Sequence, residues 1–93
     1  MRIIRTDEYI NSLLNILEFI ALDSKKRALE FRSEIDKHIN NLSIFPYKFR
    51  RSLYFDDKSI RDLIFKGYTI PYKIDTQNNQ IIILGIKKYT KEL

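Results

Sequence analysis

The stretch IRDLIFKGYTIPYKID, residues 60–75, has the pattern of two β-strands joined by a tight turn. Residues 60–66 form a short, largely apolar run, and Gly67 supplies the backbone freedom that a tight turn favours. The side chains then alternate, with Tyr68, Ile70, Tyr72 and Ile74 on one face and Thr69, Pro71 and Lys73 on the other. We therefore expect a β-hairpin whose tyrosines, Tyr68 and Tyr72, face the core.

The chain after this hairpin predicts a third strand. Residues 75–79, Asp-Thr-Gln-Asn-Asn, have the composition of a turn. Residues 80–87, Gln-Ile-Ile-Ile-Leu-Gly-Ile-Lys, are rich in β-branched side chains, which is typical of a central strand buried on both faces. Residues 60–87 therefore predict a three-stranded antiparallel sheet.

The chain before the hairpin predicts one short strand and two helices. Residues 2–5, Arg-Ile-Ile-Arg, suit a strand, and Thr6 or Asp7 can cap a helix over residues 7–22. Asp23-Ser24 interrupts the helical spacing and starts a second helix over residues 24–43. Because the connection is so short, we expect the two helices to form an antiparallel hairpin.

The elements combine into a β-α-α-β-β-β order. Phe45-Pro46 ends the second helix, since proline disfavours helical geometry in the residue before it, and residues 46–59 fit neither pattern. The prediction is an α+β fold with both helices on one face of a mostly antiparallel sheet. At 93 residues, we expect a single domain over residues 1–93.

The composition excludes several classes of site. The chain has no cysteine and one histidine, His38, which leaves no disulfide framework, thiol nucleophile or histidine-based metal centre. The adjacent acids Asp56 and Asp57 suit turn or capping roles, and we predict no metal and no cofactor. No stretch has the pattern of a signal peptide or of a membrane span, so we expect a soluble, cytoplasmic protein.

The positive charge lies in the second half of the chain. Residues 1–45 carry seven Lys or Arg and seven Asp or Glu, whereas residues 46–93 carry ten and five, which accounts for the net charge of +5. Five of the six tyrosines also lie in the second half. Basic residues interleaved with aromatic ones suit an acidic macromolecular partner.

The candidate binding residues follow from this charge. They are Arg50, Arg51, Arg61, Lys66, Lys73, Lys87, Lys88 and Tyr89. Such a group can bind phosphates while tyrosines stack on bases. It can also cleave RNA, since a cation stabilises transition-state charge and Lys or Tyr exchanges a proton.

Three stretches resemble the RelE/ParE toxin superfamily of type II toxin–antitoxin systems. They are LEFIALDSKKRALEF (17–31), the hairpin from residue 60 to residue 75, and IIILGIKK (81–88). The hairpin of this family often has Leu-Arg-x-Leu, a glycine and then Tyr-Arg-Ile-x-Tyr-x-Val; here Ile60-Arg61-Asp62-Leu63, Gly67 and residues 68–74 stand in those places. The resemblance implies a toxin held inactive by an antitoxin encoded beside it, laid over the apolar helix surfaces and the basic sheet face.

The resemblance leaves two mechanisms open. RelE-like members cleave mRNA on the ribosome with an arginine on the second hairpin strand, where this chain has Thr69, and another after the last strand, where it has Lys87, Lys88 and Tyr89. The missing arginine favours the ParE-like mechanism, in which the toxin binds DNA gyrase and is not a nuclease.

The alternatives are a ribosome-dependent endonuclease, a non-toxic nucleic-acid-binding domain and an inactive relative. The catalytic candidates of the endonuclease would be Arg61, Lys73, Lys87, Lys88 and Tyr89. The expected partners are the antitoxin and either DNA gyrase or the ribosome with its mRNA. The sequence leaves the oligomeric state of the toxin open.

Overall fold

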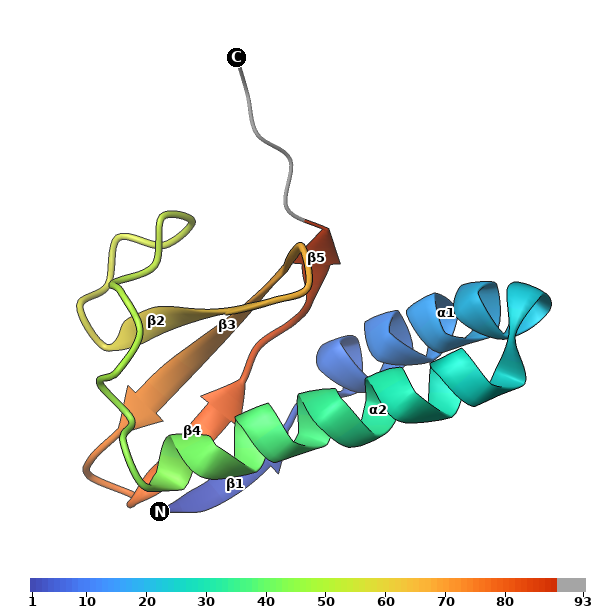
Figure 1. Cartoon of the computed structure of the whole chain (residues 1–93). Helices are drawn as coiled ribbons and strands as arrows, with labels where there is room; N and C mark the ends of the chain where they lie inside the picture. Colours follow the sequence, from blue (N-terminus) through green and yellow to red (C-terminus); the bar gives the residue numbers. More distant parts are fainter. Residues whose placement is uncertain (89–93) are drawn as a thin grey trace.

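The computed structural model describes residues 1–88 and confirms the α+β architecture. Figure 1 shows two helices lying side by side on one face of a twisted sheet. The elements are β1 (Arg2–Arg5), α1 (Asp7–Asp23), α2 (Lys25–Asn40), the 3₁₀ turn η1 (Asn41–Ser43), β2 (Ile60–Phe65), β3 (Tyr68–Asp75), β4 (Gln80–Ile83) and β5 (Lys87–Lys88). Tyr89, one of the candidate residues, lies outside the described residues.

Side-chain caps fix where both helices begin. The backbone N–H of Tyr9 donates to Thr6 Oγ1 at 3.2 Å, and that of Arg27 donates to Ser24 Oγ at 3.2 Å. Each bond satisfies a donor that the first turn of a helix leaves without an intrahelical partner. The sequence offered Thr6 or Asp7 for the first cap and Asp23-Ser24 for the second, and the structure confirms Thr6 and Ser24.

The sheet has the order β1-β4-β3-β2, and β5 also pairs with β3. The pairs β2–β3 and β3–β4 are antiparallel, whereas β1 runs parallel to β4 at the opposite edge. Lys66 and Gly67 form the hairpin turn with φ values of 46° and 81°. Positive φ at both central residues is the geometry that matches the twist of a two-residue hairpin.

The predicted strand over residues 80–87 is divided, which corrects the sequence analysis. Tyr72 pairs with Ile83, but Thr69 pairs with Lys87, so the three residues Leu84–Ile86 lie opposite only two residues of β3. This extra residue is a β-bulge. The Leu84 N–H still donates to the Pro71 carbonyl. Pro71 has no N–H with which to continue the regular pairing, and the bulge begins there.

The bulge changes which side chains enter the core. Ile81 and Ile83 are buried while Ile82 is only half-buried. The expectation that this strand is buried on both faces is therefore wrong: the helices cover one face of β4, and the other face is partly open. The extra residue then returns Ile86 to the core and places Lys87 beside Thr69 on the outer face, which is the face away from the helices.

The core lies between the helices and the inner face of the sheet. Tyr9, Phe31 and Ile35 from the helices pack with Leu63, Tyr72 and other sheet residues. Tyr72 is fully buried and Tyr68 packs against the cluster, which confirms that the two hairpin tyrosines face the core.

The outer face of the hairpin does not match the expected pattern. Thr69 and Asp62 are fully buried there, and Pro71 is buried as well, although the alternation had placed Thr69 and Pro71 away from the core. The reason is that residues 44–59 wrap around β2, and the second half of this segment lies over the outer face. The sequence had shown residues 46–59 only as irregular.

Candidate functional site

The wrapping segment, residues 44–59, pairs with the outer edge of β2. Arg51 forms an isolated antiparallel bridge with Arg61. The Asp62 N–H donates to the Arg50 carbonyl at 3.1 Å, and the Ser52 N–H donates to the Ile60 carbonyl at 2.8 Å. These bonds occupy an edge that would otherwise offer its backbone groups to another chain.

The first half of this segment is fixed to the inner face of the sheet by two side chains. Tyr72 Oη donates to the Pro46 carbonyl at 2.7 Å, and Arg61 Nη1 donates to the Phe49 carbonyl at 3.0 Å. The Arg61 guanidinium also lies 5.1 Å from the centre of the Tyr47 ring. Burial raises the pKa of Tyr72 to about 12, so its hydroxyl stays a donor at neutral pH.

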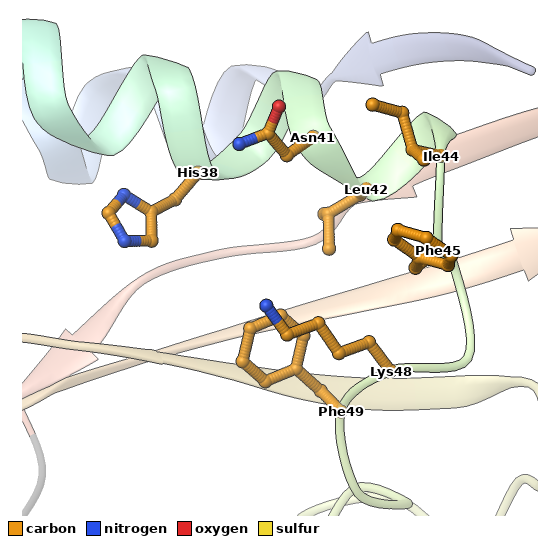
Figure 2. Close-up of a pocket in the computed structure, with 7 residues that line it drawn as sticks. All are labelled: His38, Asn41, Leu42, Ile44, Phe45, Lys48 and Phe49. Carbon is orange, nitrogen blue, oxygen red and sulfur yellow. The ribbon is translucent and has the colours of Figure 1, made fainter.

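A hollow of about 350 Å³ lies between the C-terminal end of α2 and this half of the segment. Figure 2 shows His38 and Asn41 on one side of it and Phe45, Lys48 and Phe49 on the other. Ile44, Phe45 and Tyr47 are exposed beside it. Sequence reasoning missed this feature because residues 46–59 have no periodicity, although the aromatic residues themselves were visible.

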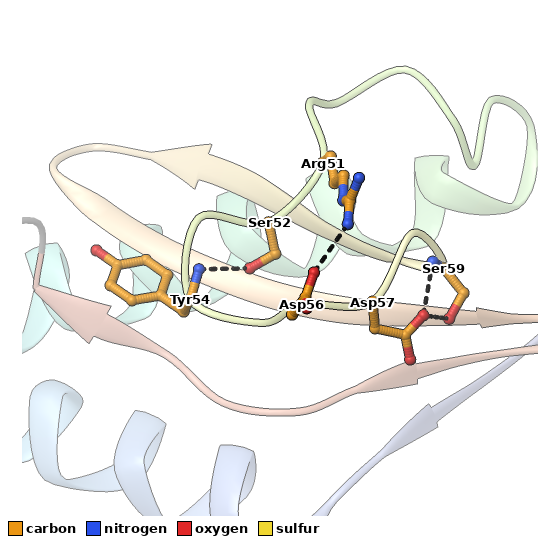
Figure 3. Close-up of polar contacts among 6 residues, drawn as sticks. All are labelled: Arg51, Ser52, Tyr54, Asp56, Asp57 and Ser59. Atoms are coloured by element: carbon orange, nitrogen blue, oxygen red, sulfur yellow. Dashed lines mark hydrogen bonds and ion pairs between the residues drawn. The ribbon is translucent and has the colours of Figure 1, made fainter.

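The second half, residues 52–59, is held over the outer face of the hairpin (Figure 3). The Leu53 N–H donates to Asp62 Oδ2 at 3.0 Å, and Asp57 Oδ1 accepts from the N–H and hydroxyl of Ser59 at 2.9 and 2.7 Å. The two bonds from Ser59 lower the pKa of Asp57. The prediction that this carboxylate serves a turn is confirmed, and the burial of Thr69 is explained by this cover.

Most of the candidate cations contact separate partners. Lys66 pairs with Glu34 of α2 at 2.7 Å, Lys73 with Asp57 at 3.7 Å, Arg51 with Asp56 at 3.2 Å and Arg50 with Asp62 at 3.9 Å. Lys87 lies 5.2 Å from the centre of the Tyr54 ring, and Lys88 is exposed beside it. Lys66 is the main reason that the pKa of Glu34 is lowered. The structure therefore distributes the predicted basic group over several places.

Thr69, which stands where the resemblance would place an arginine of the RelE-like members, is closed to solvent. Thr69 is fully buried, and its Oγ1 has no hydrogen-bond partner among residues 1–88. Over the same residues, no three His, Asp or Glu side chains are placed to hold a metal ion. No helix in this part of the chain is long and apolar enough to cross a membrane.

A second surface lies between the two helices. We call it the helix groove; its hollow of about 390 Å³ is lined by Leu14, Leu17, Glu18, Ala21, Lys25, Ala28, Leu29 and Arg32. Leu14 and Leu29 are exposed, and Phe19 and Leu22 are exposed farther along α1. At the other end, Arg5 contacts Asp36 at 3.6 Å and Asn40 at 3.2 Å. Exposed apolar side chains that lie next to one another are a common feature of surfaces that bind protein partners.

The strand, helical hairpin and antiparallel sheet, with a basic second half, define an α+β toxin of the RelE/ParE superfamily. The family described as "ParE toxin of type II toxin-antitoxin system, parDE" matches residues 3–91. The chain belongs to this ParE toxin family.

Comparison with solved structures supports the same fold. A chain of the chromosomal ParDE TA system from P. aeruginosa superposes with a TM-score of 0.79, covering 97% of each chain at 19% sequence identity. No curated protein matches the chain. The family match confirms the resemblance read from the hairpin and the helices, and it confirms the choice of the ParE-like branch.

Proposed function

We propose that this toxin arrests growth by binding DNA gyrase in the cytoplasm and is neutralised by an antitoxin encoded beside it. Membership of the ParE family supports the toxin and the antitoxin partner. The choice of gyrase over mRNA rests on how the structure arranges the basic residues.

One observation carries that choice: Thr69 is fully buried, and the cations of the hairpin contact separate partners. RNA cleavage needs several charged groups aimed at one phosphate, because they must stabilise the transition state together. Here Lys66 lies against α2 and Lys73 against Asp57. Arg61 is bound to the Phe49 carbonyl. Binding a protein target requires no such convergence.

The antitoxin is expected to occupy the helix groove. Leu14 and Leu29 expose apolar surface there, and Lys25 and Arg32 lie at its rim. An amphipathic helix with acidic residues beside its apolar face would cover this surface and pair with the rim. The extended part of the antitoxin would then reach the basic residues of the sheet.

The test expresses the chain alone and together with the neighbouring reading frame in the host bacterium. The proposal predicts an early stop of DNA synthesis while translated transcripts stay intact, and recovery when the neighbouring frame is expressed. Transcripts cut at codon-related positions, with DNA synthesis continuing, would establish the ribosome-dependent endonuclease instead.

A further inference from the structure

The surface around the Phe45 hollow combines exposed rings with positive charge. Phe45 is 67% exposed and Tyr47 is 54% exposed. Residues 37–55 contain Lys37, Lys48, Arg50 and Arg51 but no Asp or Glu. We call Phe45, Tyr47, Lys48, Arg50 and Arg51 the aromatic–basic strip. Its two rings come first and its three cations follow within the next few residues of one short segment.

The strip is held in a fixed conformation before any ligand arrives. The Tyr72 hydroxyl holds the Pro46 carbonyl, and Arg61 holds both the Phe49 carbonyl and one face of the Tyr47 ring. The Lys48 N–H donates to the Phe45 carbonyl at 3.1 Å, which closes a turn over residues 45–48 that carries both exposed rings. Because these contacts already order the segment, binding there loses little conformational entropy.

The hollow beside the strip has the lining that a flat, polar-edged ring needs. Leu42, Phe45 and Phe49 supply apolar surface, while His38, Asn41 and Lys48 supply hydrogen-bonding groups at its rim (Figure 2). Lys48 is in no ion pair within residues 1–88, and its ammonium lies 5.6 Å from the centre of the Phe49 ring. Arg50 and Arg51 each contact one carboxylate but carry further N–H donors.

We propose that the aromatic–basic strip binds single-stranded nucleic acid. One unpaired base enters the hollow or stacks on Phe45, a neighbouring base stacks on Tyr47, and Lys48, Arg50 and Arg51 bind phosphates of the same strand. Exposed rings with cations close by in the same segment form the kind of surface on which unpaired bases stack. An acidic peptide with an apolar anchor would leave the rim groups Asn41 and His38 without a role. This binding is separate from the proposed contact with gyrase.

The direct test measures fluorescence anisotropy with two labelled probes, an oligo-dT and an oligo-U of about 12 nucleotides each. Both are expected to bind similarly, because the strip offers no element dedicated to the 2′-hydroxyl. The affinity should fall as salt rises, with a slope of log Kd against log salt of about 2 for three phosphate contacts on a single strand. Much tighter binding of one probe would identify the natural ligand as DNA or RNA and would still support the strip.

Matched variants assign the binding to these residues. Phe45→Ala and Tyr47→Ala should each weaken binding by about 5- to 150-fold, since base stacking contributes about 1–3 kcal/mol per base. Tyr47→Phe keeps the ring and should bind like the unmodified chain. Lys48→Ala should lower the salt slope by about 0.7. The control is Phe19→Ala, which removes a ring that is 75% exposed on α1, far from the strip in sequence.

Three results would overturn the proposal. The first is the absence of oligonucleotide binding at about 50 mM salt. The second is equal binding by the Phe45→Ala and Phe19→Ala variants, which would leave only diffuse electrostatic attraction. The third is binding of polyglutamate with the same dependence on Phe45, which would assign the strip to an acidic protein. Circular dichroism of each variant confirms that its fold is intact, and these exposed side chains can be removed without opening the core.

Discussion

The guanidinium of Arg61 lies 5.1 Å from the centre of the Tyr47 ring and donates to the Phe49 carbonyl at 3.0 Å. Arg61 therefore holds the first half of the wrapping segment against the inner face of the sheet. We expect Arg61→Ala to lower the free energy of unfolding by about 2 kcal/mol, since it removes a charged hydrogen bond and a cation–π contact. Arg61→Lys should have an intermediate effect because lysine lacks the planar fork. Urea unfolding measures both.

The exposed Lys26→Ala on α2 is the control for this substitution and should change stability by less than about 0.5 kcal/mol. If Arg61→Ala left stability unchanged but abolished growth arrest, Arg61 would act on the target and not as a positioning residue.

The two buried tyrosines predict opposite effects of removing a hydroxyl. Tyr72→Phe loses the bond to the Pro46 carbonyl and should cost about 1 kcal/mol. Tyr9→Phe removes a buried hydroxyl that has no partner among residues 1–88, so it should be neutral or stabilising. Thermal unfolding of the two variants measures the difference. An equal loss of stability in both would contradict a stabilising hydrogen bond from Tyr72.

The same tyrosines predict instability at high pH. Burial raises the pKa of both Tyr9 and Tyr72 from 10.0 to about 12. Between these values the unfolded chain has released protons that the folded chain retains, so the stability that is present below pH 10 decreases as the pH rises toward 12. The double variant Tyr9→Phe/Tyr72→Phe should show a flatter profile in unfolding measured over this range. An unchanged slope would show that other groups cause the loss.

Substitutions of the buried Thr69 test whether this position can accept the arginine of the RelE-like nucleases. Thr69→Val removes a hydroxyl without a partner among the described residues, so stability should be unchanged or slightly higher. Thr69→Arg forces a charge beneath the loop and should destabilise the fold by on the order of 3–5 kcal/mol. A stable Thr69→Arg variant that cleaved mRNA on ribosomes would contradict this assignment of the outer face.

The helix groove predicts a separation of neutralisation from toxicity. Leu29→Glu should weaken antitoxin binding by at least about tenfold, since it places a charge in the centre of an apolar contact, while growth arrest persists. Leu22→Glu is the matched control, because Leu22 is also exposed on the helical hairpin but does not line the groove. Isothermal titration with the purified antitoxin compares the two, and an equal effect of both substitutions would argue against the groove.

The sequence was sufficient for the parts of the fold that depend on neighbouring residues. The caps at Thr6 and Ser24 and the turn at Gly67 are local signals, and each was predictable. The bulge after Ile83 was not, because the apolar run continues through it; only Pro71 on the partner strand and Gly85 within the bulge hint at the interruption.

The candidate site was less predictable because it depends on distant contacts. Thr69 alternates correctly onto the outer face, yet it is buried by residues 52–59, which carry no periodic pattern. Likewise, the partners of Lys66 and Lys73 come from α2 and from the wrapping segment. Charge counting places the cations in the second half of the chain but cannot say which of them are already paired.

The most direct test of the central claim is a supercoiling assay with purified DNA gyrase and the purified toxin. We predict that supercoiling stops as the toxin concentration rises and recovers when antitoxin is added, and that the Leu29→Glu toxin needs a higher antitoxin concentration for the same recovery. Undiminished supercoiling at saturating toxin, from a preparation that still arrests growth, would contradict gyrase as the target.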